Sequence, residues 1–252
     1  MAGRTASPVR GRGREKQPLQ RRESFRILKD AAIKPAMERA KIGFVTGLTA
    51  EARWLRNAGF MIRVGGGTPL GAEQAAKALA QEGAQGLISF GLAGGLKPGL
   101  VPGSIVVPTA VLEGNRVYPA DYALMSFLGG STGAPIYAGQ KIAETAHDKA
   151  LIYRRSHPDA IDLESGAVAR VAQARGLPFA VLRAVADPWD ADLPPVTKVA
   201  MKDDGSLNFA AITASLLRHP RQIPSLFGVA KATKDARAAL LRRLEKLPQR
   251  SF

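Results

Sequence analysis

The sequence contains no cysteine and only three histidines, His147, His157 and His219. Without cysteine the chain can form neither a disulfide nor a thiolate metal site. No two of the histidines have the spacing of metal ligands, so a zinc enzyme is not expected. Long apolar runs are also missing, because charged residues soon interrupt stretches such as Phe179–Leu182. The sequence therefore predicts no membrane-spanning helix.

Acidic residues are too few to balance the basic ones, with 21 Asp and Glu against 36 Lys and Arg and a net charge of +15. The excess lies at the ends: residues 1–40 carry 11 basic and 4 acidic residues, and residues 218–252 carry 9 and 2. Residues 41–217 carry 16 and 15 and are almost neutral. This distribution argues against a nucleic-acid cleft within the fold. It is compatible with basic ends that contact an anionic membrane surface.

The charge and the apolar pattern divide the chain into three parts. Residues 1–40 are predicted to be a disordered, basic N-terminal extension, since they show no apolar periodicity. Residues 41–217 are expected to form the catalytic domain, and residues 218–252 a basic helical segment. The extension lacks the apolar core of a secretory signal, so we expect a cytoplasmic protein, peripheral at the inner face of the membrane where its basic ends bind lipid. Met37, directly before the first predicted strand, is an alternative start of the protein.

From Lys41 onward, short apolar runs alternate with helical patterns. Strands are predicted at Ile42–Thr46, Phe60–Val64, Gly86–Phe90, Ser104–Leu112, Ile136–Gly139 and Phe179–Val185. Helices are predicted at Thr49–Asn57 with Thr49 as N-cap, Leu70–Gln81, Ala143–Arg154, Glu164–Arg175, Leu207–Arg218 and Ser225–Leu247. This alternation predicts an α/β fold, a three-layer αβα sandwich around a twisted, mixed but mostly parallel sheet.

Four segments with unusual residues follow predicted strands or precede a helix. They are Glu51, the glycine run Gly91–Leu96, the acidic segment Asp162–Glu164, and Asp187. Each alone has an ordinary explanation, as a helix acid or a tight turn. In an open α/β sheet, however, ligands bind beyond the carboxyl ends of the strands. Convergence of the four segments at that edge would therefore indicate a binding site.

Arg183 lies inside an otherwise apolar strand. An unpaired guanidinium would be costly there, unless the strand is an edge. We expect it to pair with Asp187 or with Glu164.

Four ordered blocks carry a resemblance to a known family. They are Lys41-Ile42-Gly43 with Glu51, Ser89–Leu96, Ile161–Ala167 and Leu182–Asp187. Over about residues 41–217 they resemble the signature of methylthioadenosine/S-adenosylhomocysteine nucleosidases, within the nucleoside phosphorylase superfamily. Through Asp187–Pro195 and the basic helices around His219, the sequence looks closest to the hopanoid-associated phosphorylases, which remove adenine from adenosylhopane.

The resemblance implies a role for each matching residue. Asp187 corresponds to the general acid at adenine N7, with a pKa raised by burial, because the departing purine must be stabilised. Glu164 corresponds to the carboxylate that binds the ribose hydroxyls, and its helix N-terminus would favour ionisation. Glu51 corresponds to the base that activates water, and Arg183 would orient Asp187 or the nucleophile. The further substrate contacts implied are Ser89, Gly91, Leu92, Ala93, Gly94, Asp162 and Leu163, although Asp162 stands where the family often has Glu.

Water and phosphate both remain candidate nucleophiles. Superfamily phosphorylases hold phosphate with Arg and Ser near the glycine motif, whereas Ser89 and Leu92 bring no charge here. Glu51 would also repel a phosphate dianion, so the residues favour hydrolysis. No cofactor is expected, apart from inorganic phosphate as a co-substrate if the reaction is a phosphorolysis.

The expected function is removal of adenine from a lipid-linked adenine nucleoside, adenosylhopane, in hopanoid biosynthesis. The alternative enzyme is a nucleosidase that acts on soluble methylthioadenosine or S-adenosylhomocysteine. A third hypothesis, an inert protein that binds nucleic acid or membranes, fits poorly with four intact site residues. Leu92, Met125, Phe127 and Leu128 are candidates for an apolar channel, although ordinary core is the stronger interpretation of each. The resemblance also implies a homo-oligomer, and no nucleic-acid partner is expected.

Overall fold

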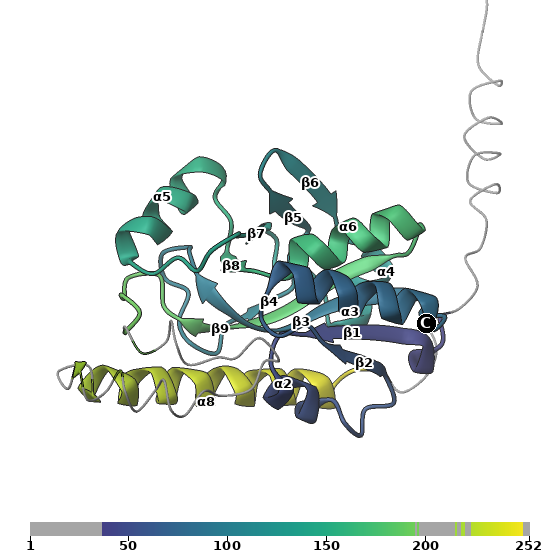
Figure 1. Ribbon diagram of the computed structural model, residues 1–252, viewed down its shortest axis with the longest axis horizontal. Coiled ribbons are helices and arrows are strands. Elements are labelled where there is room, and N and C mark those ends of the chain that lie inside the picture. The colour runs from purple at the N-terminus through teal and green to yellow at the C-terminus, as the bar shows by residue number, and fades with distance from the viewer. Residues whose placement is uncertain (1–36, 195, 197–214, 216–217, 220–222, 249–252) are drawn as a thin grey trace, which may run out of the picture. The chain divides into compact units, whose positions relative to one another are not determined.

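The computed structural model describes residues 37–194, 196, 215, 218–219 and 223–248 (Figure 1). A 3-10 turn at Arg39–Lys41 leads into the first strand. The strands of the described residues are β1 Ile42–Thr46, β2 Met61–Val64, β3 Gly86–Gly95, β4 Ile105–Val106, β5 Ala110–Glu113, β6 Arg116–Pro119, β7 Ile136–Ala138, β8 Ala160–Asp162 and β9 Phe179–Asp187. The helices are α2 Thr49–Trp54, α3 Pro69–Gln81, α4 Tyr122–Phe127, α5 Ala146–Ser156, α6 Ser165–Arg175 and α8 Ile223–Glu245.

These strands form one mixed sheet in the order β2-β1-β3-β8-β7-β5-β6, with β9 paired to both β3 and β4. Strand β3 is the central element, because it pairs in parallel with β1 and with β9 and then antiparallel with β8. The carboxyl ends of β1, β3 and β9 therefore meet at one edge of the sheet. The predicted α/β class with a mixed, mostly parallel sheet is confirmed.

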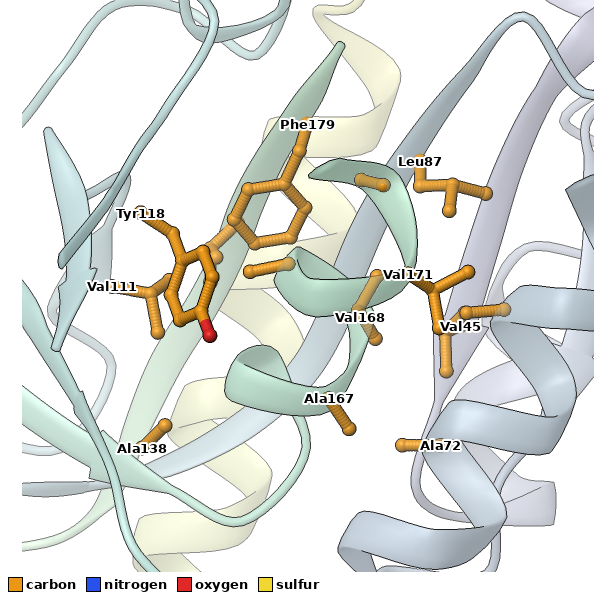
Figure 2. Packing of buried hydrophobic residues seen from close by; sticks show 14 of the residues in the cluster. Val45, Ala72, Leu87, Val111, Tyr118, Ala138, Ala167, Val168, Val171 and Phe179 are labelled. Carbon is orange, nitrogen blue, oxygen red and sulfur yellow. The ribbon is translucent and has the colours of Figure 1, made fainter. Parts of the chain in front are cut away.

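Helices cover both faces of this sheet. In Figure 1, α3 and α6 lie side by side over one face, and α8 runs along the other. Figure 2 shows α6 between Tyr118 and Val111 on one side and Val45 and Leu87 on the other. The opposite face is filled by β1, β3 and β9 side chains that pack against α4 and the buried residues of α8. Burial of this apolar surface is the main stabilising contribution to the fold.

Three local expectations from the sequence are corrected. The strand predicted to end at Phe90 continues through the glycine run to Gly95, because both edges of that segment find pairing partners in β8 and β9. Thr49 is the first residue of α2 and not its N-cap, which is Leu48. The helix predicted from Ala143 begins at Ala146, after the Thr145 side chain accepts the N–H of Asp148 at 3.1 Å.

The two boundaries predicted from the sequence lie close to the limits of the described residues. The described body begins at Met37, four residues before the expected boundary of the N-terminal extension, and the rest of that extension lies outside the described residues. The expected 217/218 boundary and almost all of the Leu207–Arg218 helix also lie outside them. Helix α8 packs directly on the β9 face through Ala236, Leu240 and Leu244. Within the described ranges, no helix is long and apolar enough to cross a membrane.

Candidate active site

A cavity of about 230 Å³ opens at the edge where β1, β3 and β9 end. Its lining comes from the turn after β1, the start of α2, the second half of β3, the end of β8 and the end of β9. The lining residues are Gly47, Leu48, Glu51, Gly67, Leu92, Ala93, Gly94, Ile142, Ala143, Ile161, Asp162, Leu163, Glu164, Arg183, Ala186, Asp187 and Leu193. Residues more than 130 positions apart in sequence thus surround one space.

Arg183 is held at the floor of the cavity and is almost completely buried. Its Nη2 donates to Glu164 Oε2 at 2.6 Å and to Ser89 Oγ at 2.7 Å, and its Nη1 donates to the Leu92 carbonyl at 3.2 Å. Its Nε lies 2.8 Å from Asp162 Oδ2. Burial alone would lower the pKa of Arg183, but Asp162 and Glu164 outweigh that effect and raise it, so the guanidinium stays charged. The expected pairing with Glu164 is confirmed.

Glu51 is buried in the first turn of α2 with both oxygens held by backbone N–H groups. Oε2 accepts from Gly47 at 3.0 Å and from Leu48 at 2.9 Å, and Oε1 accepts from Leu92 at 2.8 Å. Burial raises the pKa of Glu51 to about 7, with Glu164 adding to the shift and Arg183 opposing it. A carboxyl group with this pKa can exchange a proton near neutral pH.

Glu164 and Asp162 pair with different nitrogens of the same guanidinium. Asp162 is fixed in turn by α6, because its Oδ1 accepts the Ser165 N–H at 3.1 Å and its Oδ2 accepts the Ser165 hydroxyl. The sequence predicts that the helix N-terminus favours ionised Glu164, but burial acts in the other direction and raises its pKa against the attraction of Arg183. Desolvation therefore outweighs the attraction of Arg183 at this position.

Asp187, the last residue of β9, also lines the cavity and pairs with a different cation. Its Oδ2 lies 2.7 Å from Nζ of Lys149, a fully buried residue of α5. Burial raises the pKa of Asp187, as expected, and the bond to Lys149 opposes the shift. Among the described residues Arg183 contacts Glu164 and Asp162 and makes no contact with Asp187, and the expectation that Arg183 orients Asp187 or the nucleophile stays a prediction. Its guanidinium is held by Ser89 and Leu92 of β3 and by the carboxylates of Asp162 and Glu164 that precede α6.

Two glycines let the backbone pass close to the carboxyl groups. Gly91 has φ +147, and a Cβ there would stand 2.6 Å from Cδ of Glu51. A Cβ at Gly47 would stand 3.0 Å from Cδ of Glu164. Side chains at these positions would displace the acids, which explains why glycine occupies both.

The other predicted contacts divide into two groups. Leu92, Ala93, Gly94, Asp162 and Leu163 line the cavity. Ser89 and Gly91 lie beneath it, where Ser89 bonds Arg183 and Gly91 packs on Glu51.

Met125, Phe127 and Leu128 are buried in the core against β9 and α8, as the core interpretation predicts. Of the four candidates for an apolar channel, Leu92 alone is a lining residue of this cavity.

Sequence reasoning missed Lys149 and the apolar lining residues Leu48, Ile142, Ala143 and Leu193. A signal for Lys149 existed, because Ile152 and Tyr153 share its helical face three and four positions later and pack toward the core. Its place on an inward face could have marked it as a buried charge. Among the described residues, no group of three or more His, Asp or Glu side chains is arranged to hold a metal ion.

Comparisons with known proteins agree with this geometry. The profile of the family described as Phosphorylase superfamily matches residues 44–135 and 130–218. The S-adenosylhomocysteine nucleosidase structure from Streptococcus pyogenes matches with a TM-score of 0.59 and 17% identity, covering 86% of this chain and 100% of that chain. The 5′-methylthioadenosine/S-adenosylhomocysteine nucleosidase from Neisseria meningitidis gives 0.58 and 16%, covering 82% and 99%.

Futalosine hydrolase of Helicobacter pylori matches with a TM-score of 0.58 and 13% identity, covering 82% of this chain and 97% of that chain. At such identities the structural matches show the shared fold. The search of curated proteins gave no match.

Proposed function

Since the chain belongs to the Phosphorylase superfamily, we propose that it is a nucleosidase that hydrolyses the N-glycosidic bond of an adenine nucleoside. The family and the fold identify an enzyme that cleaves nucleoside N-glycosyl bonds. The single observation that supports the hydrolytic assignment is the one cavity that Glu51, Glu164 and Asp187 all line, together with the Arg183 guanidinium that binds Glu164. Three carboxyl groups in different electrostatic settings can serve the sugar, the base and the nucleophile separately.

Glu164 would bind the sugar. Its Oε2 is held by Arg183, so its Oε1 is left to accept from a ribose hydroxyl. As the C1′–N9 bond breaks, the ribose gains oxocarbenium character. A carboxylate next to the sugar stabilises that developing positive charge.

Asp187 would protonate the leaving base. Breaking the C1′–N9 bond places an electron pair on the purine, and a proton delivered to N7 neutralises it. The raised pKa of Asp187 supports this role, because burial keeps the group protonated at higher pH than an exposed aspartate.

Glu51 would remove a proton from the attacking water. Phosphate is less suited to this cavity, because among the described lining residues Arg183 is the cationic side chain. The nitrogens of Arg183 already contact Asp162, Glu164, Ser89 and Leu92. Members of the superfamily that use phosphate as a co-substrate need positively charged side chains that can bind it. In this cavity the carboxylate of Glu51 would also repel a phosphate dianion.

The 5′ group of the substrate is proposed to be apolar. Leu48, Leu92, Ile142 and Leu193 line the cavity and offer no partner to a charged group. At about 230 Å³ the cavity is smaller than sites for drug-sized ligands, which are roughly 300–1,000 Å³. It would therefore enclose the nucleoside and leave a bulky lipid outside, which fits adenosylhopane. Methylthioadenosine, with its small apolar 5′ group, is the second candidate substrate.

The basic ends support a peripheral location at the inner face of the membrane. Helix α8 exposes the basic side chains Lys231, Lys234, Arg237 and Arg242, and the exposed Lys246 follows its last residue. We also expect a homo-oligomer on the basis of the family resemblance.

The direct test incubates the protein with adenosylhopane, methylthioadenosine or S-adenosylhomocysteine, each with and without phosphate. Free adenine and the sugar product are measured. The proposal expects adenine with free ribose product from the first two substrates, independent of phosphate. A ribose 1-phosphate product would replace hydrolysis by phosphorolysis, and absence of adenine from every substrate would reject the adenine nucleosidase.

A further inference from the structure

Lys149 carries a buried charge that none of the roles above uses. Its side chain is 0% exposed. Its ammonium group lies 2.7 Å from Asp187 Oδ2 and donates to the carbonyl oxygens of Pro188 and Ala191, both at 2.8 Å. A lysine has three N–H donors, so each has one acceptor. Any rotation of Nζ away from Asp187 would leave a buried donor unsatisfied, which fixes its position.

The segment after β9 has other attachments to α5. The Ala146 N–H donates to Asp192 Oδ1 at 2.8 Å, and the Leu193 N–H donates to the Glu144 carbonyl at 2.8 Å. These two bonds already fasten the segment to the start of the helix. A neutral donor would suffice to complete the turn, whereas a buried ammonium is costly to desolvate unless its charge is used.

We propose that Lys149 is a positioning residue for the reaction, which holds Asp187 through Oδ2 and stabilises the carboxylate that forms when Oδ1 gives its proton to the departing base. This inference rests on the proposed function of Asp187. In the step, the Asp187 proton moves to N7, the electron pair of C1′–N9 goes to the purine, and the Lys149 ammonium keeps all its protons. The negative charge left on Asp187 is then neutralised across one hydrogen bond.

The electrostatics around Asp187 agree with this assignment. Burial raises the pKa of Asp187, and Lys149 is the charge that acts against that shift. Removal of Lys149 should therefore raise the Asp187 pKa further and make the group a weaker acid. Glu51, Asp162, Glu164 and Arg183 line the same cavity as Asp187. The titratable groups next to Lys149 in the chain and in the segment after β9 are Glu144, His147, Asp148, Asp190 and Asp192.

The kinetic test compares two variants. Lys149→Met removes the charge and keeps an unbranched side chain, while the control Asp192→Ala removes a neighbouring attachment to α5 without touching Asp187. We expect Lys149→Met to lower kcat by about 100-fold, with KM changed less, and to move the Asp187 limb of the pH profile to higher pH. The control should leave that limb in place.

A double-mutant cycle separates positioning from simple folding support. In an Asp187→Asn background, Lys149→Met should reduce the residual rate no further, because its effect passes through Asp187. Equal losses in both backgrounds, or an unmoved pH limb in Lys149→Met, would reject the proposal.

An NMR titration, which does not depend on catalysis, completes the test. In carboxyl-¹³C-aspartate protein, the Asp187 signal should titrate at higher pH in Lys149→Met than in the wild type. In the wild type, the ¹⁵Nζ signal of Lys149 should shift with the same midpoint as Asp187, which needs no variant to fold. A Lys149 signal that does not respond to the Asp187 titration would overturn the inference. If this coupling holds but no nucleoside releases adenine, the proposed function fails while the electrostatic link stands.

Discussion

At the scale of single residues, the buried acids of the site are divided between two cations, Arg183 and Lys149. Burial raises the pKa of Glu51, Glu164 and Asp187 alike. Arg183 opposes the effect for the two glutamates, and Lys149 opposes it for Asp187. Glu164, which would bind the sugar, and Asp187, which would protonate the purine, can therefore have different protonation states at one pH. Acid–base catalysis at two centres requires this difference.

Replacement of Glu51 by Gln tests the nucleophile. The variant keeps the side-chain shape but removes the base, so adenine release should fall by about 10²–10⁴-fold with or without phosphate. Glu82→Gln is the matched control, because Glu82 is a partly exposed acid paired with Arg63 and should leave the rate unchanged. Activity of Glu51→Gln that returns on addition of phosphate would contradict hydrolysis.

The pH dependence follows from the pKa of Glu51, which burial raises to about 7. The base must be ionised to act, so kcat/KM should decrease as pH falls below about 7, by roughly tenfold per unit. Initial rates across neutral pH, with circular dichroism to confirm folding at each point, measure this. A rate that stays constant well below neutrality would show that Glu51 is not the base.

At the scale of elements, strand β3 provides both the sheet centre and the cavity wall. Its first half is apolar and buried, and its second half consists largely of glycine and alanine that run past Glu51 and β8. The long helix α8 contributes on the other face, where it packs on β9. The contributions of β3 and α8 can therefore be tested by separate substitutions.

Gly91→Ala should disrupt the site from within β3. The new Cβ would stand 2.6 Å from Cδ of Glu51 on a backbone with φ +147. Such strain costs about 1–3 kcal/mol, and displacement of Glu51 should abolish most activity. Urea unfolding and adenine release are the measurements, with Gly83→Ala as control, since Gly83 also has positive φ (+92) but its Cβ would meet nothing within 4 Å. Unchanged activity in Gly91→Ala would contradict the tight contact.

Leu240→Ala tests whether α8 belongs to the core. Leu240 is fully buried, so the cavity left by truncation should lower the free energy of unfolding by about 2–5 kcal/mol. The control Leu70→Ala, on a side chain that is 67% exposed, should change it by less than about 0.5 kcal/mol. Similar unfolding midpoints for both variants would mean that α8 contributes little to stability.

The whole molecule combines an almost neutral body with two basic ends. Each Lys or Arg near an anionic membrane surface contributes about 1 kcal/mol, so the ends together could hold the protein there.

Vesicle sedimentation tests this arrangement. The protein should bind vesicles that contain phosphatidylserine at low salt and dissociate at high salt, because added ions screen the attraction. A variant with Lys231, Lys234 and Arg237 all changed to Glu should bind markedly less, and neutral phosphatidylcholine vesicles serve as the control. Equal binding to both kinds of vesicle would contradict an electrostatic contact.

The sequence by itself determined the α/β class, the approximate places of most strands and helices, and the need of Arg183 for a carboxylate partner, with Asp187 and Glu164 as the two candidates. Local hydrophobic periodicity predicts the fold class and the strands and helices. The energetic cost of an unpaired buried guanidinium predicts that Arg183 binds a carboxylate. The four sequence blocks also supplied the residues that now line one cavity.

Only the tertiary structure decided the continuation of β3 through its glycines and the pairing of Asp187 with Lys149. Strand pairing for Gly94 and Gly95 comes from β8, more than 60 positions later in the chain. Lys149 meets Asp187 because α5 and the end of β9 pack together, and in sequence it is one of several charged residues of its helix. Long-range packing sets the burial and the partner of each charge, and local sequence patterns do not encode it.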